Sequence, residues 1–204
     1  MMLEIGANIG TSSIYAGLTG RFTKILAVEA DARNFDLLCT NIRINNLQDV
    51  IMPVYAGVSD HMGEGLLQRH ALHSGMSTLE PTENFFAQGT VSGEQSVSLR
   101  TADDILREAG IEPEDVTLVW MDIEGHEPKA FVGMSELLSH KPVIYFEYSP
   151  HRYSDDEVNW IQKNVVDAYD KARLYSDQWY DLPENGLHGL NPEEHRFHMN
   201  VLVC

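Results

Sequence analysis

The sequence predicts an α/β protein built on a mostly parallel twisted sheet, with helices on both faces and an antiparallel strand at the C-terminus. Three observations predict it. A short apolar run at residues 1–5 leads through a glycine-spaced loop into a helical pattern, apolar strands at residues 25–29, 116–121 and 142–146 each end at a carboxylate, and helix-periodic segments separate the strands. Strands alternating with helices are typical of parallel sheets joined by crossover helices.

The composition indicates one globular domain spanning residues 1–204. The chain is 43% hydrophobic and 22% charged, which is ordinary for a globular protein. Its formal net charge is −17, so we expect no nucleic-acid and no membrane-surface partner, because an acidic surface repels both. Two distant cysteines, Cys39 and Cys204, and no visible signal peptide or membrane span favour the reducing cytoplasm. The oligomeric state stays open.

The first loop predicts a nucleoside site. Gly6 and Gly10 allow a sharp turn and close approach of a ligand, and the helix that we expect from Ser13 onward places its positive end behind them. Glu29 ends the second apolar strand about 20 residues after the loop, where an acid binds ribose hydroxyls in nucleotide-binding α/β folds. Dinucleotide sites carry a third glycine where Thr11 stands, so a nicotinamide-dependent oxidoreductase remains only a weaker alternative.

The middle of the chain predicts a helix, a strand and an insertion. Asp31 is placed to cap a helix whose apolar positions include Cys39, and a third strand is expected over residues 50–58. Ser59 and Asp60 follow that strand, where they either face a ligand crevice or close a turn. Residues 61–98 form an insertion with short strands near 66–68 and 97–99, which we expect to cover the substrate site.

The second half of the chain repeats the strand-to-carboxylate pattern. A helix capped by Thr101 precedes the apolar run at residues 116–121, which leads into Asp122, Glu124, His126 and Glu127. A helix is expected from Pro128, a strand at 142–147, a helix capped by Asp155, a loop at 177–196 and an antiparallel pair at 173–175 and 199–203. The pairs His70/His73 and His195/His198 lack a third ligand, so no metal is predicted.

Several separated motifs resemble one family. Residues 4–10 (EIGANIG), 28–30 (VEA), Asn41, Asn45, 121–127 (MDIEGHE) and 145–147 (YFE) are similar to the FkbM-type S-adenosylmethionine (SAM) methyltransferases. The resemblance extends from residue 1 to about residue 150. It implies a Rossmann-like class I methyltransferase fold, SAM as cofactor and O-methylation of a hydroxyl on a sugar or other small molecule. Family members typically carry helices before the first strand and a lysine where Met121 stands, so a non-catalytic or truncated binding protein is an alternative.

The resemblance and the spacing together assign candidate roles. Glu29 would hold the ribose, the Gly6–Gly10 loop with Glu4 the methionine part, and Asp122 with Glu124 would face the reacting centre, with His126 as the second candidate base. Alternatively, Glu124 and Glu127 cap the following helix. The predicted cofactor-binding residues are Glu4, Gly6, Ala7, Asn8, Gly10, Ser13, Glu29, Ala30, Ser59, Asp60 and Asp122. The predicted catalytic residues are Asp122, Glu124 and His126.

Overall fold

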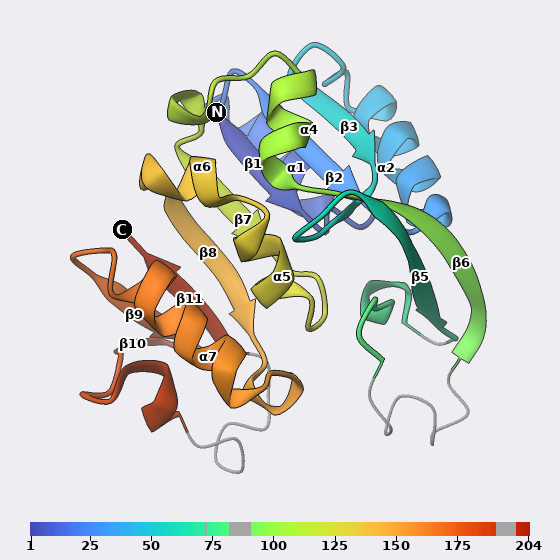
Figure 1. The fold of residues 1–204 in the computed structure, drawn as a ribbon. Helices are drawn as coiled ribbons and strands as arrows, with labels where there is room; N and C mark the ends of the chain where they lie inside the picture. Colours follow the sequence, from blue (N-terminus) through green and yellow to red (C-terminus); the bar gives the residue numbers. More distant parts are fainter. Residues whose placement is uncertain (72, 82–90, 191–198) are drawn as a thin grey trace.

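The computed structural model describes residues 1–71, 73–81, 91–190 and 199–204, which form two sheets and the helices around them (Figure 1). The larger sheet has eight strands in the order β10-β9-β11-β8-β7-β1-β2-β3. Its strands are β1 (Met2–Ile5), β2 (Ile25–Glu29), β3 (Ile51–Tyr55), β7 (Leu118–Met121), β8 (Val143–Tyr148), β9 (Ala172–Tyr175), β10 (Trp179–Asp181) and β11 (Met199–Val203).

Strand directions confirm the predicted mixed sheet. The pairs β1–β2, β2–β3, β1–β7 and β7–β8 are parallel. Strand β11 inserts antiparallel between β8 and β9, and β10 adds antiparallel to β9. The carboxyl ends of β1, β2 and β7 therefore meet at one edge of the sheet, where open α/β folds bind ligands.

Helices cover the sheet on both faces. Helices α4 to α7 lie on one face and α1 and α2 on the other (Figure 1). The helices are α1 (Thr11–Leu18), α2 (Ala32–Ile44), α4 (Ala102–Glu108), α5 (Glu127–Val132), α6 (Ser135–Ser139) and α7 (Asp155–Ile161), which a π-turn continues over Gln162–Val166. Short 3-10 turns lie at η1 (Ser74–Met76), η2 (Pro113–Asp115), η3 (Pro150–Arg152) and η5 (Gly186–Gly189). None of the helices within the described ranges is both long and apolar enough to cross a bilayer.

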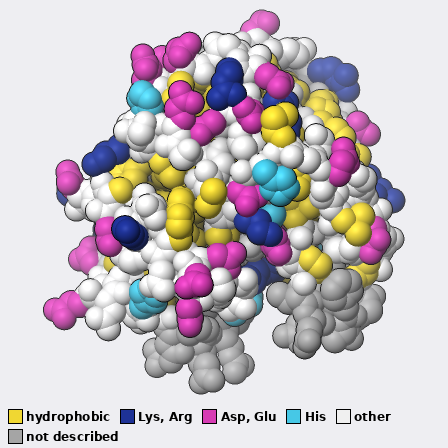
Figure 2. All heavy atoms as spheres, in the orientation of Figure 1, with side chains coloured by type: hydrophobic (Ala, Val, Ile, Leu, Met, Phe, Trp, Pro, Cys, Tyr) yellow, Lys and Arg dark blue, Asp and Glu magenta, His cyan; other side chains and the backbone are white. Residues whose placement is uncertain are grey.

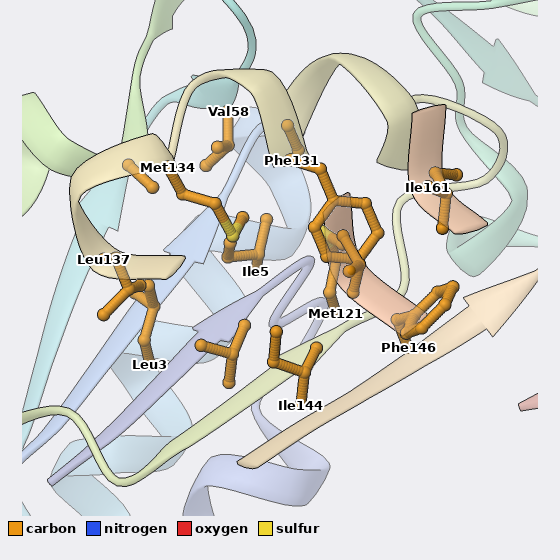
Figure 3. Close-up of a cluster of buried hydrophobic side chains, with 14 of the residues drawn as sticks. Leu3, Ile5, Val58, Met121, Phe131, Met134, Leu137, Ile144, Phe146 and Ile161 are labelled. Atoms are coloured by element: carbon orange, nitrogen blue, oxygen red, sulfur yellow. The ribbon is translucent and has the colours of Figure 1, made fainter. Parts of the chain in front are cut away.

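The larger hydrophobic core lies between the sheet and helices α4 to α7. Figure 3 shows Phe131 of α5 pointing toward Phe146 of β8, and the two rings meet edge to face with centroids 5.0 Å apart. A second core packs α1 and α2 against β1, β2 and β3. Asp and Glu side chains are spread over the face drawn in Figure 2, as the negative net charge requires.

Two helix caps agree with the prediction from the sequence and one differs from it. Asp31 accepts hydrogen bonds from the main-chain N of Arg33 and Asn34, and Thr101 accepts one from Asp104 N, as predicted. The cap of α7 is Ser154 and not Asp155. Ser154 and Glu157 form a reciprocal capping box, which satisfies two N–H groups where Asp155 alone would satisfy one.

The residues predicted as one strand at 50–58 belong to two sheets. Strand β3 ends at Tyr55, and after Ala56 the chain forms β4 (Gly57–Val58) in the three-stranded sheet β4-β6-β5. The predicted short strands of the insertion are the long antiparallel strands β5 (Gly63–His70) and β6 (Val91–Arg100). We call β5 and β6, with the described residues that connect them (73–81), the hairpin. The loop expected at 177–196 contains β10 and η5, and His195 and His198 lie outside the described residues.

The helix predicted from Pro128 is divided at Gly133 into α5 and α6. A Cβ at Gly133 would lie 2.0 Å from the main-chain O of Ser59, so the segment that follows β4 passes too close for any side chain. Cys39, expected in the core, is only half-buried, and both cysteines are free. These departures come from neighbouring segments that local sequence patterns do not reveal.

We expect Phe131→Ala to lower the free energy of unfolding by about 3–5 kcal/mol, because the ring is fully buried against Phe146 and its loss leaves a cavity. Val132, the next residue, is 44% exposed, and Val132→Ala serves as the matched control with an expected change within about 0.5 kcal/mol. Urea denaturation measures both values. Equal destabilisation by the two substitutions would contradict this description of the core.

Candidate functional site

A cavity of about 210 Å³ opens at the carboxyl ends of β1, β2 and β7 and is closed on one side by the hairpin. Its lining combines carboxylates with small and apolar residues. The residues that line it are Glu4, Ile5, Gly6, Ala7, Asn8, Thr11, Ser12, Val28, Glu29, Ala30, Asn34, Ala56, Gly57, Val58, Leu67, Gly75, Ser77, Leu79, Trp120, Asp122, Ile123, Glu124 and His126.

The two glycines of the β1–α1 loop are required by the packing of the protein itself. Gly6 has φ +86°, and a Cβ there would lie 2.0 Å from the main-chain O of Asp122. Gly10 has φ +92°, and a Cβ there would lie 2.7 Å from Leu38 Cδ1. Gly6 lines the cavity, whereas Gly10 lies behind it and sets the direction in which α1 begins.

Glu29 joins the two loops at the cavity. Its Oε2 accepts a hydrogen bond from Asn8 N at 2.7 Å, and its Oε1 accepts one from Asp31 N at 2.8 Å. Burial raises the pKa of this carboxyl above its ordinary value. Because each carboxylate oxygen can accept a second hydrogen bond, the side chain can also bind hydroxyl groups of a ligand.

Glu4 forms a second buried carboxyl group in the cavity. Ser13 Oγ donates a hydrogen bond to its Oε2, and the residue is 2% exposed. Burial raises the pKa of Glu4 from 4.5 to about 7, although the hydrogen bond from Ser13 works in the opposite direction. Ser13 does not line the cavity, so it acts on the site only through Glu4.

Asn8 lines the cavity and carries a buried side-chain oxygen that no group in the described part of the protein satisfies. Its backbone is left-handed, with φ +51°, and the residue lines the cavity. Within the described part of the chain, its Oδ1 is buried without a hydrogen-bond partner. A buried acceptor without a partner is costly, so this atom suits a ligand that brings a donor.

The turn after β7 and the neighbouring strand β8 together form a cluster of three carboxylates. One ligand oxygen each from Asp122, Glu124 and Glu147 lies within 4.8 Å of the others. Asp122 is exposed and the other two are buried. Arg152 donates to Glu124 Oε2 at 3.0 Å and to its main-chain O, so it supplies positive charge to the cluster. Three such oxygens can bind a divalent cation, but acidic groups alone do not establish a metal site, and we assign none.

His126 lines the cavity with both ring nitrogens engaged. Its Nδ1 lies 3.0 Å from Glu80 Oε1 and its Nε2 lies 3.0 Å from Ser59 Oγ. Hydrogen bonds from His126 and Lys129 lower the pKa of Glu80 to about 2, so Glu80 is ionised at neutral pH. To act as a base, His126 would have to release one of these partners.

Glu127 shapes the turn from inside the protein. It is fully buried and accepts hydrogen bonds from Ile123 N at 2.8 Å, Gly125 N at 2.9 Å and Tyr153 Oη at 2.8 Å. Burial raises its pKa to about 7. Its role is therefore structural, because these hydrogen bonds hold the loop that carries Glu124. The alternative of a helix cap is not what the structure shows, since α5 has no side-chain cap hydrogen bond at its start.

The structure brings together most of the predicted site residues. Nine of them line the cavity, namely Glu4, Gly6, Ala7, Asn8, Glu29, Ala30, Asp122, Glu124 and His126. Gly10, Ser13, Ser59 and Asp60 lie outside the lining. Ser59 is turned toward His126 instead, and Asp60 pairs with His61 at 2.6 Å.

The sequence predicted that the insertion would cover the site, but it did not identify which residues of the hairpin do so. Leu67, Gly75, Ser77 and Leu79 line the cavity, and Glu80 contacts His126. None of these residues belongs to a recognisable motif, and long-range pairing places them at the site, namely that of β5 with β6 and the bridge between Gln68 and Thr78. The one available signal was the length of the insertion.

The fold is that of the class I methyltransferases. The crystal structure of a methyltransferase FkbM from Methylobacillus flagellatus KT superposes with a TM-score of 0.59 at 21% identity, covering 100% of this chain and 43% of that one. A precorrin-6y C5,15-methyltransferase from Geobacter metallireducens GS-15 superposes with a TM-score of 0.52 at 12% identity, covering 100% of this chain and 78% of that one. At these identities the likeness concerns the fold alone.

Residues 4–178 match the family described as the methyltransferase FkbM domain, and the chain belongs to that family. The predicted resemblance is thus confirmed. A shorter match joins it to the 2-O-methyltransferase NoeI of Sinorhizobium fredii (strain NBRC 101917 / NGR234), with 44% identity over 57 residues, which are 28% of this chain and 23% of NoeI. The chain spans less than half of the length of the M. flagellatus protein.

Glu4 is expected to make the stability of the protein depend on pH. Its pKa is about 7 in the folded protein and 4.5 as the ordinary value, so its contribution is complete below pH 4.5 and is lost as the pH rises through 7. Between pH 4.5 and about pH 8, wild type should lose up to about 3 kcal/mol more of its free energy of unfolding than Glu4→Gln.

Urea denaturation over this pH range measures the difference between the two proteins. Glu127, whose pKa is also raised to about 7, is present in both and cancels in the comparison. If the free energy of unfolding changes with pH in the same way in wild type and in Glu4→Gln, folding does not raise the pKa of Glu4 and the prediction is wrong.

Proposed function

We propose that this protein is a SAM-dependent methyltransferase that methylates a hydroxyl oxygen of a small molecule or carbohydrate. The main support for this proposal is the position of the Glu29 carboxylate. It lies in the cavity at the end of β2 and accepts a hydrogen bond from the main-chain N–H of Asn8 in the glycine loop. Membership of the FkbM family supports methyl transfer, and the name of NoeI, a 2-O-methyltransferase, supports oxygen as the acceptor atom.

The lining residues fit the parts of SAM. Glu29 would accept the ribose hydroxyls, and Asn8 Oδ1, buried and without a partner among the described residues, would accept a donor of the cofactor. Glu4, Gly6 and Ala7 would face its methionine part, where the Glu4 carboxyl group suits the ammonium of the amino acid. Bound SAM would supply an electrophilic methyl group.

Asp122 is the group best placed to take the proton of the acceptor hydroxyl. It is the exposed member of the carboxylate cluster and lines the cavity, so an acceptor can reach it. Arg152 holds the neighbouring Glu124 in place through two hydrogen bonds, which favours a role for Glu124 in orienting the acceptor. His126 remains the second candidate base because both its nitrogens already have partners.

Glu29→Ala should weaken S-adenosylhomocysteine binding at least about tenfold, because the ribose would lose hydrogen bonds to a charged group. Titration calorimetry measures the affinity, with the exposed Glu114→Ala as the control that keeps wild-type affinity. Equal affinity of wild type and Glu29→Ala would refute the ribose role of Glu29. Failure of wild type itself to bind S-adenosylhomocysteine would refute the proposed cofactor.

Asp122→Asn should keep S-adenosylhomocysteine affinity within about twofold and lower turnover by about 100-fold, because the amide cannot accept the proton. Release of S-adenosylhomocysteine from SAM, measured across a panel of hydroxylated acceptors that includes saccharides, gives the turnover. An unchanged turnover rate in Asp122→Asn would show that Asp122 is not the base and would leave His126 and Glu124 as the candidates. Binding without turnover by wild type on every acceptor would favour a non-catalytic binding protein.

A further inference from the structure

We infer that the hairpin supplies one wall of the nucleoside site and that Leu79 is a specificity-determining contact for the purine ring. This inference rests on the proposed function and assigns to the hairpin a role in cofactor binding. The sequence had suggested instead that this insertion covers the acceptor.

The apolar residues of the hairpin lie at the nucleoside end of the cavity. Leu67 and Leu79 line it together with Ala30, which directly follows the ribose acid Glu29. Ala30 and Leu79 also pack on the small hydrophobic cluster that Leu67 forms with Val97 and Leu99. The wall is therefore continuous with the core of the three-stranded sheet.

Two glycines leave the space that Leu79 occupies. A Cβ at Gly57 would lie 3.3 Å from Leu79 Cδ1, and a Cβ at Gly65 would lie 3.1 Å from Leu79 Cδ2. The same Cβ atoms would lie still closer to Leu99 Cδ2, at 3.0 and 2.9 Å, so the two glycines make room for Leu79 and Leu99 together. Gly57 belongs to β4 and Gly65 to β5, the strands on the two sides of β6, and Leu79 therefore packs in the protein without a ligand.

Polar contacts fasten the hairpin to the segment that carries the ribose acid. Arg69 Nε donates to Asp31 Oδ2 at 2.7 Å, and this ion pair is largely buried. Gln95 Nε2 donates to Ala30 O at 2.9 Å. Because Asp31 N in turn donates to Glu29 Oε1, the apolar wall and the ribose acid are held by one connected network.

The chemistry of this end of the cavity fits a purine nucleoside. A purine offers a flat face of low polarity, which suits leucine and alanine side chains, and its attached sugar offers hydroxyl donors, which suit Glu29. Asn34 and Ser77, which also line the cavity, add polar groups without adding charge. A charged ligand group at this end would be poorly solvated beside Leu67 and Leu79.

The test compares two ligands that share the nucleoside but differ in the amino acid. Titration calorimetry with S-adenosylhomocysteine and with 5′-methylthioadenosine is carried out on wild type, Leu79→Val, Leu79→Ala and Leu66→Ala. Leu66 precedes Leu67 on β5, is 50% exposed and does not line the cavity, so it is the matched control. Thermal melting without ligand identifies any variant that fails to fold.

We expect Leu79→Ala to lower the affinity for both ligands by the same factor, about tenfold. The affinity of Leu79→Val should be intermediate, and that of Leu66→Ala should equal the wild-type affinity. If Leu79→Ala fails to fold, the affinities of the more conservative variant Leu79→Val for the two ligands test the inference. If wild type binds S-adenosylhomocysteine and the Leu79 variants bind it equally tightly, the inference is overturned while the proposed function stays intact. Loss of S-adenosylhomocysteine alone, with 5′-methylthioadenosine unaffected, would also overturn it.

Discussion

The hydrogen bonds that the buried Glu29 carboxylate accepts from Asn8 N and Asp31 N are the interaction on which the site depends. They connect the turn after β1 with the turn after β2, and Asp31 extends the connection to the cap of α2 and to Arg69 of the hairpin. Taking a carboxylate out of water is costly, and these N–H donors offset the cost. The shape of the cavity is therefore set by a buried carboxyl group whose oxygens are also available to a ligand.

The mostly parallel sheet could be predicted because several apolar runs end at a carboxylate and are separated by helical patterns. Glu29 and Asp122 mark such ends, and both lie at the cavity. Glu4 could be predicted only from its motif, since a carboxyl group inside an apolar strand looks unfavourable until Ser13 is placed beside it. Motifs thus identified the residues of the β1 and β7 turns correctly as neighbours.

What could not be predicted depends on contacts between distant segments. The break after Tyr55 arises because β4 pairs with β6, about forty residues further along the chain. Ser59 was expected near the ligand, but its partner is His126, a contact that no local pattern encodes. The same holds for Leu67 and Leu79, because Leu67 is placed at the cavity by the pairing of β5 with β6 and Leu79 by the bridge between its neighbour Thr78 and Gln68 of β5.

A single residue, Ala56, connects β3 of the larger sheet to β4 of the smaller sheet, so the chain turns a corner there. The hydrogen bond from Ala56 N to Glu29 O, at 3.1 Å, holds this corner in place. Asp122 and Glu124 follow β7 of the larger sheet, whereas Leu67 and Leu79 belong to the hairpin on the other side of this corner. Under the proposed function, a change in the hairpin wall would alter contacts to the cofactor and leave Asp122 and Glu124 in place, whereas a change of angle at Ala56 would move the wall relative to these carboxylates and to Glu29.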